Sequence, residues 1–230
     1  MATNSLKVRP ATTSDLDQLS TIFTRSFHPV SPYMRRTFPD TAAMRAWWRS
    51  LYTTALADPE ATLMVVTTEP SGNDDSVIAL GQWRFFPDYP HRPPRLELES
   101  ATSAQLDPNG NLAAGTWSLL RSCEDTDLEL YRGMTGFLAE MHGKMMAGTP
   151  HYNMELLATV QEAKGKGAGR LLVEELGRVA DAKGVVAFVE TNNIVVEFYR
   201  KMGWVVKEQL AMPGGVGYEE YILVREPKKE

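Results

Sequence analysis

The residues Lys164–Arg170 place three glycines at alternate positions, with three cationic side chains among them. An amphipathic run that indicates a helix follows directly. The first amide N–H groups of a helix have no partner within the helix, and together with the helix dipole they attract anions, phosphate above all. Glycine also lets the main chain approach a ligand closely and adopt positive φ. We therefore predict that this loop binds a pyrophosphate.

The spacing of the glycines limits which class of pyrophosphate-containing ligand the loop could bind. A Walker loop requires G-x-x-x-x-G-K-[ST], which Arg170 and Leu171 do not satisfy. A dinucleotide-binding loop requires G-x-G-x-x-G, whereas the glycines here follow G-x-G-x-G. Glu190 nevertheless lies near the position, about twenty residues on, where such a loop is followed by an acidic residue. A nucleotide-binding βαβ unit and a flexible surface loop therefore stay open as alternatives.

The loop is expected to be held between regular elements. His151–Val160 predicts a strand before it, and the short apolar run Val185–Thr191 predicts a buried strand after the helix. Asn192 or Asn193 is expected to cap a last helix that ends at Gly203. Strand, helix and strand in this order imply a parallel crossover.

The rest of the chain alternates between helical and strand patterns. Pro87–Asp125 is rich in proline and turn-forming residues and is interpreted as a long loop or lid. We predict a mixed α/β sheet with helices on both faces, in a single domain of residues 1–230 with an inserted loop and helix at about 87–148. The other expected elements are a strand at 6–11, a helix capped by Ser14, a loop at 28–40, a helix capped by Asp40 or Thr41, strands at 61–69 and 76–86, a helix opened by the capping-box spacing of Thr126 and Glu129, and a closing hairpin at 204–212 and 218–226.

The bulk composition excludes several classes of function. The chain of 230 residues has a net charge of −5, which argues against general nucleic-acid binding because phosphate binding needs a cationic face. The single cysteine, Cys123, excludes an internal disulfide framework. No signal peptide and no apolar run of membrane-spanning length is recognised. We expect a cytoplasmic protein without a membrane partner.

The second half of the chain resembles the GNAT N-acetyltransferase superfamily. That family carries [RQ]-x-x-G-x-[GA] after its fourth strand, then a helix, a strand, and a helix ending in Tyr-x-x-x-Gly-[Phe/Trp], which Tyr199–Trp204 matches. LKVRPATTSDLDQLSTIF looks like the family's first strand and helix. The long insert resembles a fungal subgroup of small-molecule acetyltransferases. The resemblance implies a mostly antiparallel sheet of about seven strands, in which the fourth and fifth strands splay apart.

The resemblance also implies acetyl-CoA as the co-substrate, without a metal. The main chain of the strand end would pair with the pantetheine arm, and Asn192 would cap the last helix, contact the arm, or both. Two residues depart from the family pattern, because Lys164 stands where Arg or Gln is usual and Gln161 replaces the usual proline before the loop. Lysine serves a phosphate as a point charge and not as a bidentate fork. The expected cofactor-binding residues are Ala158, Thr159, Val160, Lys164, Gly165, Lys166, Gly167, Ala168, Gly169, Arg170 and Asn192.

Acetyl transfer to an amine requires a base for the amine and benefits from a proton for the departing thiolate. Tyr199 matches the tyrosine that often protonates the thiolate in this family. Glu155 is the ionisable residue of an apolar strand, where apolar neighbours would raise its pKa, so we predict that it is the base. Glu190 and a water route without a dedicated base are the alternatives.

The motifs do not identify the acceptor. Phe27, Tyr33 and Trp83 are the expected substrate-binding residues, with part of the helix at 131–145, because large apolar groups suit a small amine with an apolar body. We predict an acetyl-CoA-dependent N-acetyltransferase, monomeric or homodimeric, that acts by direct transfer in a ternary complex. The alternative is an acyl-CoA-binding sensor or interaction module without useful catalysis.

Overall fold

The computed structural model describes residues 5–68, 76–89, 123–214 and 217–228. The predicted loop or lid at 87–125 therefore lies largely outside the described residues. The described elements are β1 (Leu6–Pro10), α1 (Leu16–Phe27), α2 (Pro32–Thr37), α3 (Ala42–Ala57), β2 (Ala61–Thr68), β3 (Ser76–Phe86), α5 (Leu128–Met146), β4 (His151–Thr159), α6 (Ala168–Lys183), β5 (Val186–Asn192), α7 (Val196–Arg200), β6 (Val205–Ala211) and β7 (Glu219–Arg225), with short 3-10 turns at Thr13–Asp15 and Gln161–Ala163.

The strands form one seven-stranded sheet in the order β1-β2-β3-β4-β5-β7-β6. Every neighbouring pair is antiparallel except β4 and β5, which are parallel and joined through α6. The prediction of a mixed, mostly antiparallel sheet of about seven strands is confirmed.

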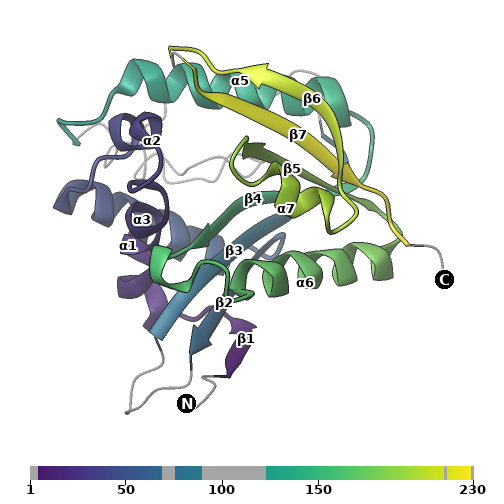
Figure 1. Cartoon of the computed structure of the whole chain (residues 1–230), viewed down its shortest axis with the longest axis horizontal. Coiled ribbons are helices and arrows are strands. Elements are labelled where there is room, and N and C mark those ends of the chain that lie inside the picture. Colours follow the sequence, from purple (N-terminus) through teal and green to yellow (C-terminus); the bar gives the residue numbers. More distant parts are fainter. Residues whose placement is uncertain (1–4, 69–75, 90–122, 215–216, 229–230) are drawn as a thin grey trace.

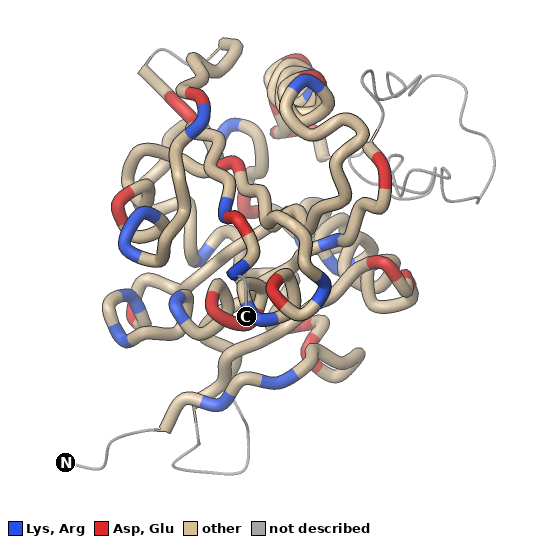
Figure 2. The backbone as a smooth tube through the Cα atoms, turned by 90° about the vertical axis from the view of Figure 1, so that its right-hand side faces the viewer, with Lys and Arg blue, Asp and Glu red and all other residues tan. Residues whose placement is uncertain are grey.

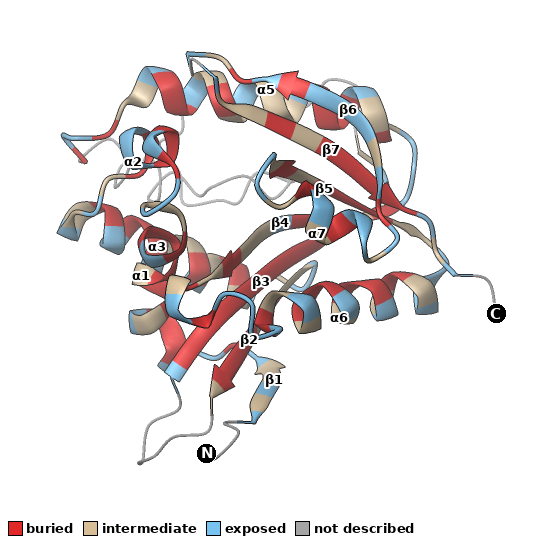
Figure 3. Ribbon diagram, viewed as in Figure 1, coloured by how far each residue is buried: buried red, intermediate tan, exposed pale blue. Residues whose placement is uncertain are grey.

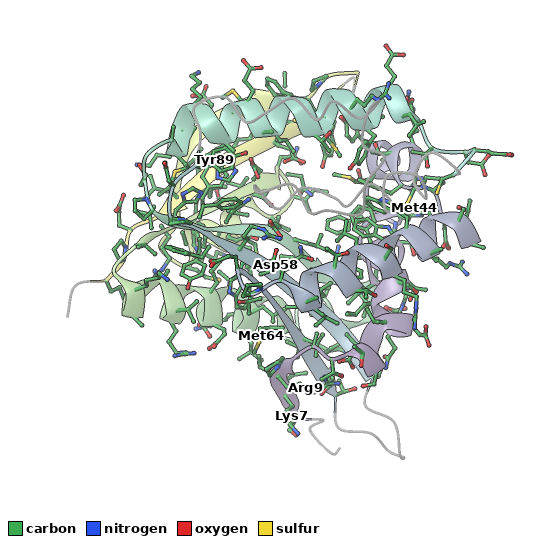
Figure 4. The ribbon with its side chains drawn as sticks, turned by 180° about the vertical axis from the view of Figure 1, so that it is seen from behind. Lys7, Arg9, Met44, Asp58, Met64 and Tyr89 are labelled. Carbon is green, nitrogen blue, oxygen red and sulfur yellow. The ribbon has the colours of Figure 1, made fainter. Side chains whose placement is uncertain are left out.

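Helices flank the sheet on both faces (Figure 1). α6 packs across β2 to β5 on one face. α1 and α3 pack on β2 to β4 and are seen in front of these strands when the molecule is viewed from behind (Figure 4). α5 lies beside the β6–β7 hairpin (Figure 1) and contacts α2.

One predicted loop and two predicted helix caps need correction. The expected loop at 28–40 contains the helix α2, because Ser31 accepts a hydrogen bond from Met34 N at 3.2 Å and Pro32 occupies the first turn, where it removes no helical bond. Ser14 is not a cap, since the chain makes a 3-10 turn there before α1. α5 is capped by Asp127, whose Oδ1 accepts from Leu130 N at 3.0 Å, and not by Thr126. Thr41 does cap α3, as predicted.

The central strands and the inner sides of the helices form the core (Figure 3). α6 shows buried residues on one side and exposed residues on the other along its whole length, as an amphipathic helix on a sheet should. Basic and acidic residues are interspersed over the side of the molecule seen in Figure 2. Within the described part of the chain, no helix has both the length and the apolar character that a membrane crossing requires.

Candidate active site

β4 and β5 separate halfway along their length. Their pairing runs from His151 opposite Val186 to Met154 opposite Val189 and then stops. β4 continues to Thr159 and β5 to Asn192 without further pairing to each other, so main-chain groups of both strands face the gap. The predicted splay is therefore confirmed.

A β-bulge marks the place where the two strands part. Gln82 pairs with Leu156 and Trp83 with Met154, which leaves Glu155 as the extra residue of β4. A bulge bends its strand, re-aims a side chain and is frequent beside active sites. The two-residue alternation assumed for Glu155 is interrupted at this residue.

The glycine loop leads into α6 at the open end of β4. Gly165 and Gly167 have φ of +76° and +94°, which disfavours any side chain at either position. Leu171 N donates to Gly167 O at 3.1 Å, so the amides of Ala168, Gly169 and Arg170 precede the first intrahelical bond. These amides form the anion-attracting helix start that the sequence predicts.

The loop is anchored at its beginning. Gln161, which stands where the family has proline, donates from Nε2 to Ser26 O at 2.5 Å and ties the loop to α1. Val160 N donates to Ile78 O at 3.0 Å. A Cβ at Gly169 would lie 3.3 Å from Thr159 Oγ1, so the start of α6 is packed closely against β4.

One cavity of about 1400 Å³ connects the loop with the opposite side of the sheet. Its walls include the glycine loop and α7 at one end, and α1, α3 and α5 at the other. The predicted site residues that line it are Phe27, Glu155, Thr159, Lys164, Gly165, Gly167, Ala168, Gly169, Arg170, Asn192 and Tyr199, together with Glu190.

Several predicted residues do not line this cavity. Trp83 is 1% exposed and packs in the core with α6, where a Cβ on Gly81 would lie 3.1 Å from its ring. Tyr33 is buried, donates to Pro213 O and stacks on Tyr218, which itself lines the cavity. Trp83 is thus a core residue, and Tyr33 packs behind Tyr218, outside the cavity lining. Ala158, Val160 and Lys166 also lie outside the lining, the first two buried in the core.

Glu155 is surrounded by polar partners and not by the apolar neighbours that were expected. Its Oε1 accepts from Arg84 Nε at 2.9 Å and its Oε2 from Gln82 Nε2 at 2.6 Å. Arg84 also pairs with Asp58, so its guanidinium bridges two carboxylates. Asp58 lies at the end of α3, against the sheet (Figure 4). The expectation that Glu155 has apolar surroundings is wrong.

Two other carboxylates of the cavity have strongly perturbed pKa values. Burial, together with the nearby charges of Glu220 and Glu155, raises the pKa of Glu190 to about 8. Burial raises the pKa of Glu220 to about 7, against the effect of a hydrogen bond from Tyr218 Oη to Oε1 at 3.1 Å. Sequence reasoning missed Glu220, although it alternates with Ile222 and Val224 and so belongs to the buried face of β7.

Tyr199 is 1% exposed and its ring packs edge-on against Trp204, with centroids 5.4 Å apart. Burial raises the pKa of its phenol, which therefore keeps its proton throughout the neutral range. Asn192 does not cap α7, which begins only at Val196; its Oδ1 instead accepts from Ile194 N at 3.0 Å. The cap prediction for Asn192 and Asn193 is wrong, because a turn intervenes between β5 and the helix.

Tyr199 and Glu190 reach the cavity from opposite faces of the sheet. Val189 packs in the same cluster as Tyr199, whereas Phe188 belongs to the cluster that includes α1, α3 and α5. Glu190 alternates with Val189 and therefore points to the side of Phe188. A group bound at the glycine loop and a second molecule bound below α5 can meet in the gap between β4 and β5.

Comparison with known proteins gives a consistent picture. A model of the acetyltransferase (GNAT) family matches residues 77–204. A comparison with curated protein sequences finds no match.

Solved structures share the fold along nearly the whole chain. An apo variant of an agmatine N-acetyltransferase has a TM-score of 0.59 at 13% identity and covers 96% of this chain and 99% of its own. The polyamine N-acetyltransferase of Drosophila melanogaster, described as forming N-acetylagmatine, has a TM-score of 0.57 at 13% identity, covering 96% and 100%. NAA60 of Arabidopsis thaliana in complex with acetyl-CoA has a TM-score of 0.54 at 12% identity, covering 96% and 98%.

Proposed function

The chain belongs to the GNAT family of acetyltransferases, and on this premise we propose that it transfers the acetyl group of acetyl-CoA to the amine of a small molecule in a ternary complex. The proposal rests on one continuous cavity that runs from the glycine loop through the gap between β4 and β5. At its other end lies an acidic floor that contains Glu155, Glu190 and Glu220. Both reactants can occupy it at once, one from each face of the sheet.

The residues at the gap fit acetyl-CoA. The pyrophosphate would be held by the amides that open α6 and by the charge of Lys164, and the pantetheine arm by the unpaired edge of β4 between Glu155 and Thr159. When bound, acetyl-CoA supplies an activated acetyl thioester. The contacts proposed for it are Ala158, Thr159, Val160, Lys164, Gly165, Lys166, Gly167, Ala168, Gly169, Arg170 and Asn192. Ala158, Val160 and Lys166, which do not line the cavity, would act through the main chain.

Glu190 takes the role of base in place of Glu155. Glu155 is held in the pair with Arg84 and Gln82, whereas Glu190 lines the cavity without an ion pair among the described residues. A pKa of about 8 lies close to the working pH at which a base is most effective. An ammonium ion beside Glu190 favours its ionised form, so substrate binding prepares it to accept the proton.

Tyr199 supplies the proton that the leaving group needs. The neutral amine forms a bond to the acetyl carbonyl carbon, the C–S bond breaks, and the thiolate takes a proton from the phenol. Glu190 takes the proton that the bound ammonium ion loses and passes it to solvent, and it then takes the second N–H proton when the C–N bond forms. Solvent restores both groups. The raised pKa of Tyr199 ensures that the phenol is protonated when the thiolate departs.

The acceptor is a small amine. The cavity floor is rich in carboxylates, and the wall formed by α1, α3 and α5 is apolar. This combination suits a ligand that carries a cationic group on an apolar body. The similarity in fold to agmatine and polyamine N-acetyltransferases supports an amine of this size.

Two measurements test the proposal together. Thermal unfolding is followed with acetyl-CoA, CoA, NAD and ATP, and a ligand at about 100 times its Kd adds about 2.7 kcal/mol to the stability of the folded state. Release of CoA thiol is then measured with a panel of amines. We expect stabilisation by the CoA species alone and thiol release with at least one amine. Stabilisation without thiol release would identify a binding module, and stabilisation by NAD or ATP alone would reject the CoA site.

A further inference from the structure

Glu190 and Glu220 form a pair of carboxylates on one face of two neighbouring strands. Glu190 of β5 stands opposite Ile222 of β7, and Asn192 stands opposite Glu220. The two glutamates are therefore diagonal neighbours, at a spacing that long side chains can bridge. Both line the cavity, and Glu220 is only 6% exposed.

Neither Glu190 nor Glu220 forms an ion pair in the part of the chain that the structure describes. The hydrogen bond that Glu220 accepts at 3.1 Å is donated by the neutral hydroxyl of Tyr218. The cation of the floor, Arg84, is already held between Asp58 and Glu155. The described part of the floor thus offers two carboxyl groups that a bound cation would ionise, while its own cation, Arg84, is already paired.

Two further side chains of the floor carry acceptors that have no hydrogen-bond partner among the described residues. Asn153 and Gln82 line the cavity and are 8% and 6% exposed, and Asn153 Oδ1 and Gln82 Oε1 are buried without a hydrogen-bond partner. A buried acceptor without a donor is costly, so each is satisfied by a ligand that brings N–H groups. An ammonium group, with three donors and a positive charge, matches both this deficit and the carboxylate pair.

The wall opposite the floor is apolar and preformed. Rings from α1, α3 and the α2–α3 connection pack on one another, as shown by Phe23 and Trp48, with centroids 4.6 Å apart. Phe38 packs edge-on against Tyr131 of α5, with centroids 5.8 Å apart. These residues and Leu138 line the cavity. Aromatic walls of this kind contact apolar or aromatic ligand bodies.

We propose that the acceptor is an amine with an apolar or aromatic body and no carboxylate, and that Glu220 is a specificity-determining residue that enforces this choice. The inference rests on the proposed acetyl transfer and deepens it. A carboxylate next to the amine would lie beside Glu190 and Glu220, where the one cation of the described floor, Arg84, is already held between Asp58 and Glu155. Like charges placed together are a common means of rejecting a wrong ligand. Amino acids are therefore excluded, although their decarboxylated counterparts fit.

Matched pairs of acceptors test the substrate class. Phenethylamine is compared with phenylalanine, and tryptamine with tryptophan, by kcat/KM for thiol release from acetyl-CoA. We expect each amine to exceed its amino acid by roughly 100-fold or more. Comparable turnover of both members, or turnover of the amino acids alone, overturns this inference and leaves the acetyltransferase proposal standing. If no amine or amino acid supports thiol release, both this inference and the acetyltransferase proposal are rejected.

A pair of variants on one strand tests the role of Glu220. Glu220→Gln keeps the size of the side chain and the acceptor for Tyr218, and Glu219→Gln is the matched control, because Glu219 is the adjacent residue on the other face of β7 and contacts Tyr221. We expect Glu220→Gln to raise KM for the amine and to reduce the amine-to-amino-acid ratio about tenfold, with KM for acetyl-CoA unchanged. Glu219→Gln should keep the wild-type ratio. An unaltered ratio in a folded Glu220→Gln variant, judged by its thermal unfolding, overturns the assignment.

Discussion

Oε1 of Glu155 lies 2.9 Å from Nε of Arg84, whose guanidinium also pairs with Asp58. The carboxylate that the sequence marks as the base is thus part of a three-residue ion-pair network that joins β4, β3 and the end of α3. A carboxylate that bridges two elements in this way holds the bulge of β4 in place. We propose Glu190 as the base instead, and the first prediction tests this assignment.

Replacing Glu190 by Gln should lower kcat about 100-fold or more, because a positioned general base contributes at least this much, while KM for acetyl-CoA stays near the wild-type value. Steady-state thiol release over a pH series measures both constants. Glu155→Gln is the comparison: it should lower the melting temperature by breaking the pair with Arg84, with a smaller effect on kcat. A large loss of kcat in Glu155→Gln beside a near-normal Glu190→Gln would return the base to Glu155.

Replacing Tyr199 by Phe should lower kcat and leave the affinity for acetyl-CoA nearly intact, because only the proton donor is removed and the buried ring is kept. Tyr221→Phe is the matched control, since the Tyr221 hydroxyl bonds to Glu219 away from the cavity. Isothermal titration gives the affinity and thiol release gives kcat. Unchanged turnover in Tyr199→Phe across the pH range would remove Tyr199 from the mechanism.

Replacing Gly167 by Ala should weaken acetyl-CoA binding, because φ of +94° costs a residue with a Cβ about 1–2 kcal/mol and the loop will relax away from the pyrophosphate. Gly184 ends the same helix at φ of +68° with open space around it, so Gly184→Ala carries a similar strain at the far end of α6. Both variants should lose similar stability in thermal unfolding, and only Gly167→Ala should lose affinity. Equal affinities in the two variants would exclude the helix start as the anion site.

The buried pair of His142 and His151 predicts that stability falls in acid. His151 Nδ1 donates to Thr149 O at 2.7 Å, so its Nε2 accepts from Nε2 of His142 at 2.6 Å, and both rings are neutral. Tyr89 stacks on His142 beneath α5 (Figure 4), and burial with the charge of His151 lowers the pKa of His142 to about 3.

The unfolded chain therefore binds a proton at His142 below its ordinary pKa, near 6.5, whereas the folded chain does not until about pH 3. Above pH 6.5 both states are neutral at this residue and it contributes no slope. The free energy of unfolding should fall as the pH drops from 6.5, and less steeply in His142→Gln, which can still donate to His151. Urea unfolding at pH 7.5, 6.5 and 5.5 measures this. Parallel pH profiles of the two proteins would contradict it.

The sequence by itself determined the strands and most of the helices, though not α2, and it indicated the cofactor end of the site. Hydrophobic periodicity is a local property, so it located the strand before Lys164, the amphipathic helix after Gly167 and the stripe of α5. The glycine loop could be recognised because anion binding at a helix start depends on consecutive residues. The Tyr-x-x-x-Gly-Trp ending likewise marked Tyr199 as a candidate proton donor within one short segment.

Only the tertiary structure decided which side chains share the acceptor end. Glu190 and Glu220 are brought together by the pairing of β5 with β7, and Arg84 meets Glu155 through the pairing of β3 with β4. Trp83 looked like a pocket residue, but which face of a strand meets a cavity and which meets a helix depends on the register and on a one-residue bulge. Such relationships join residues far apart in the chain, and no local pattern encodes them.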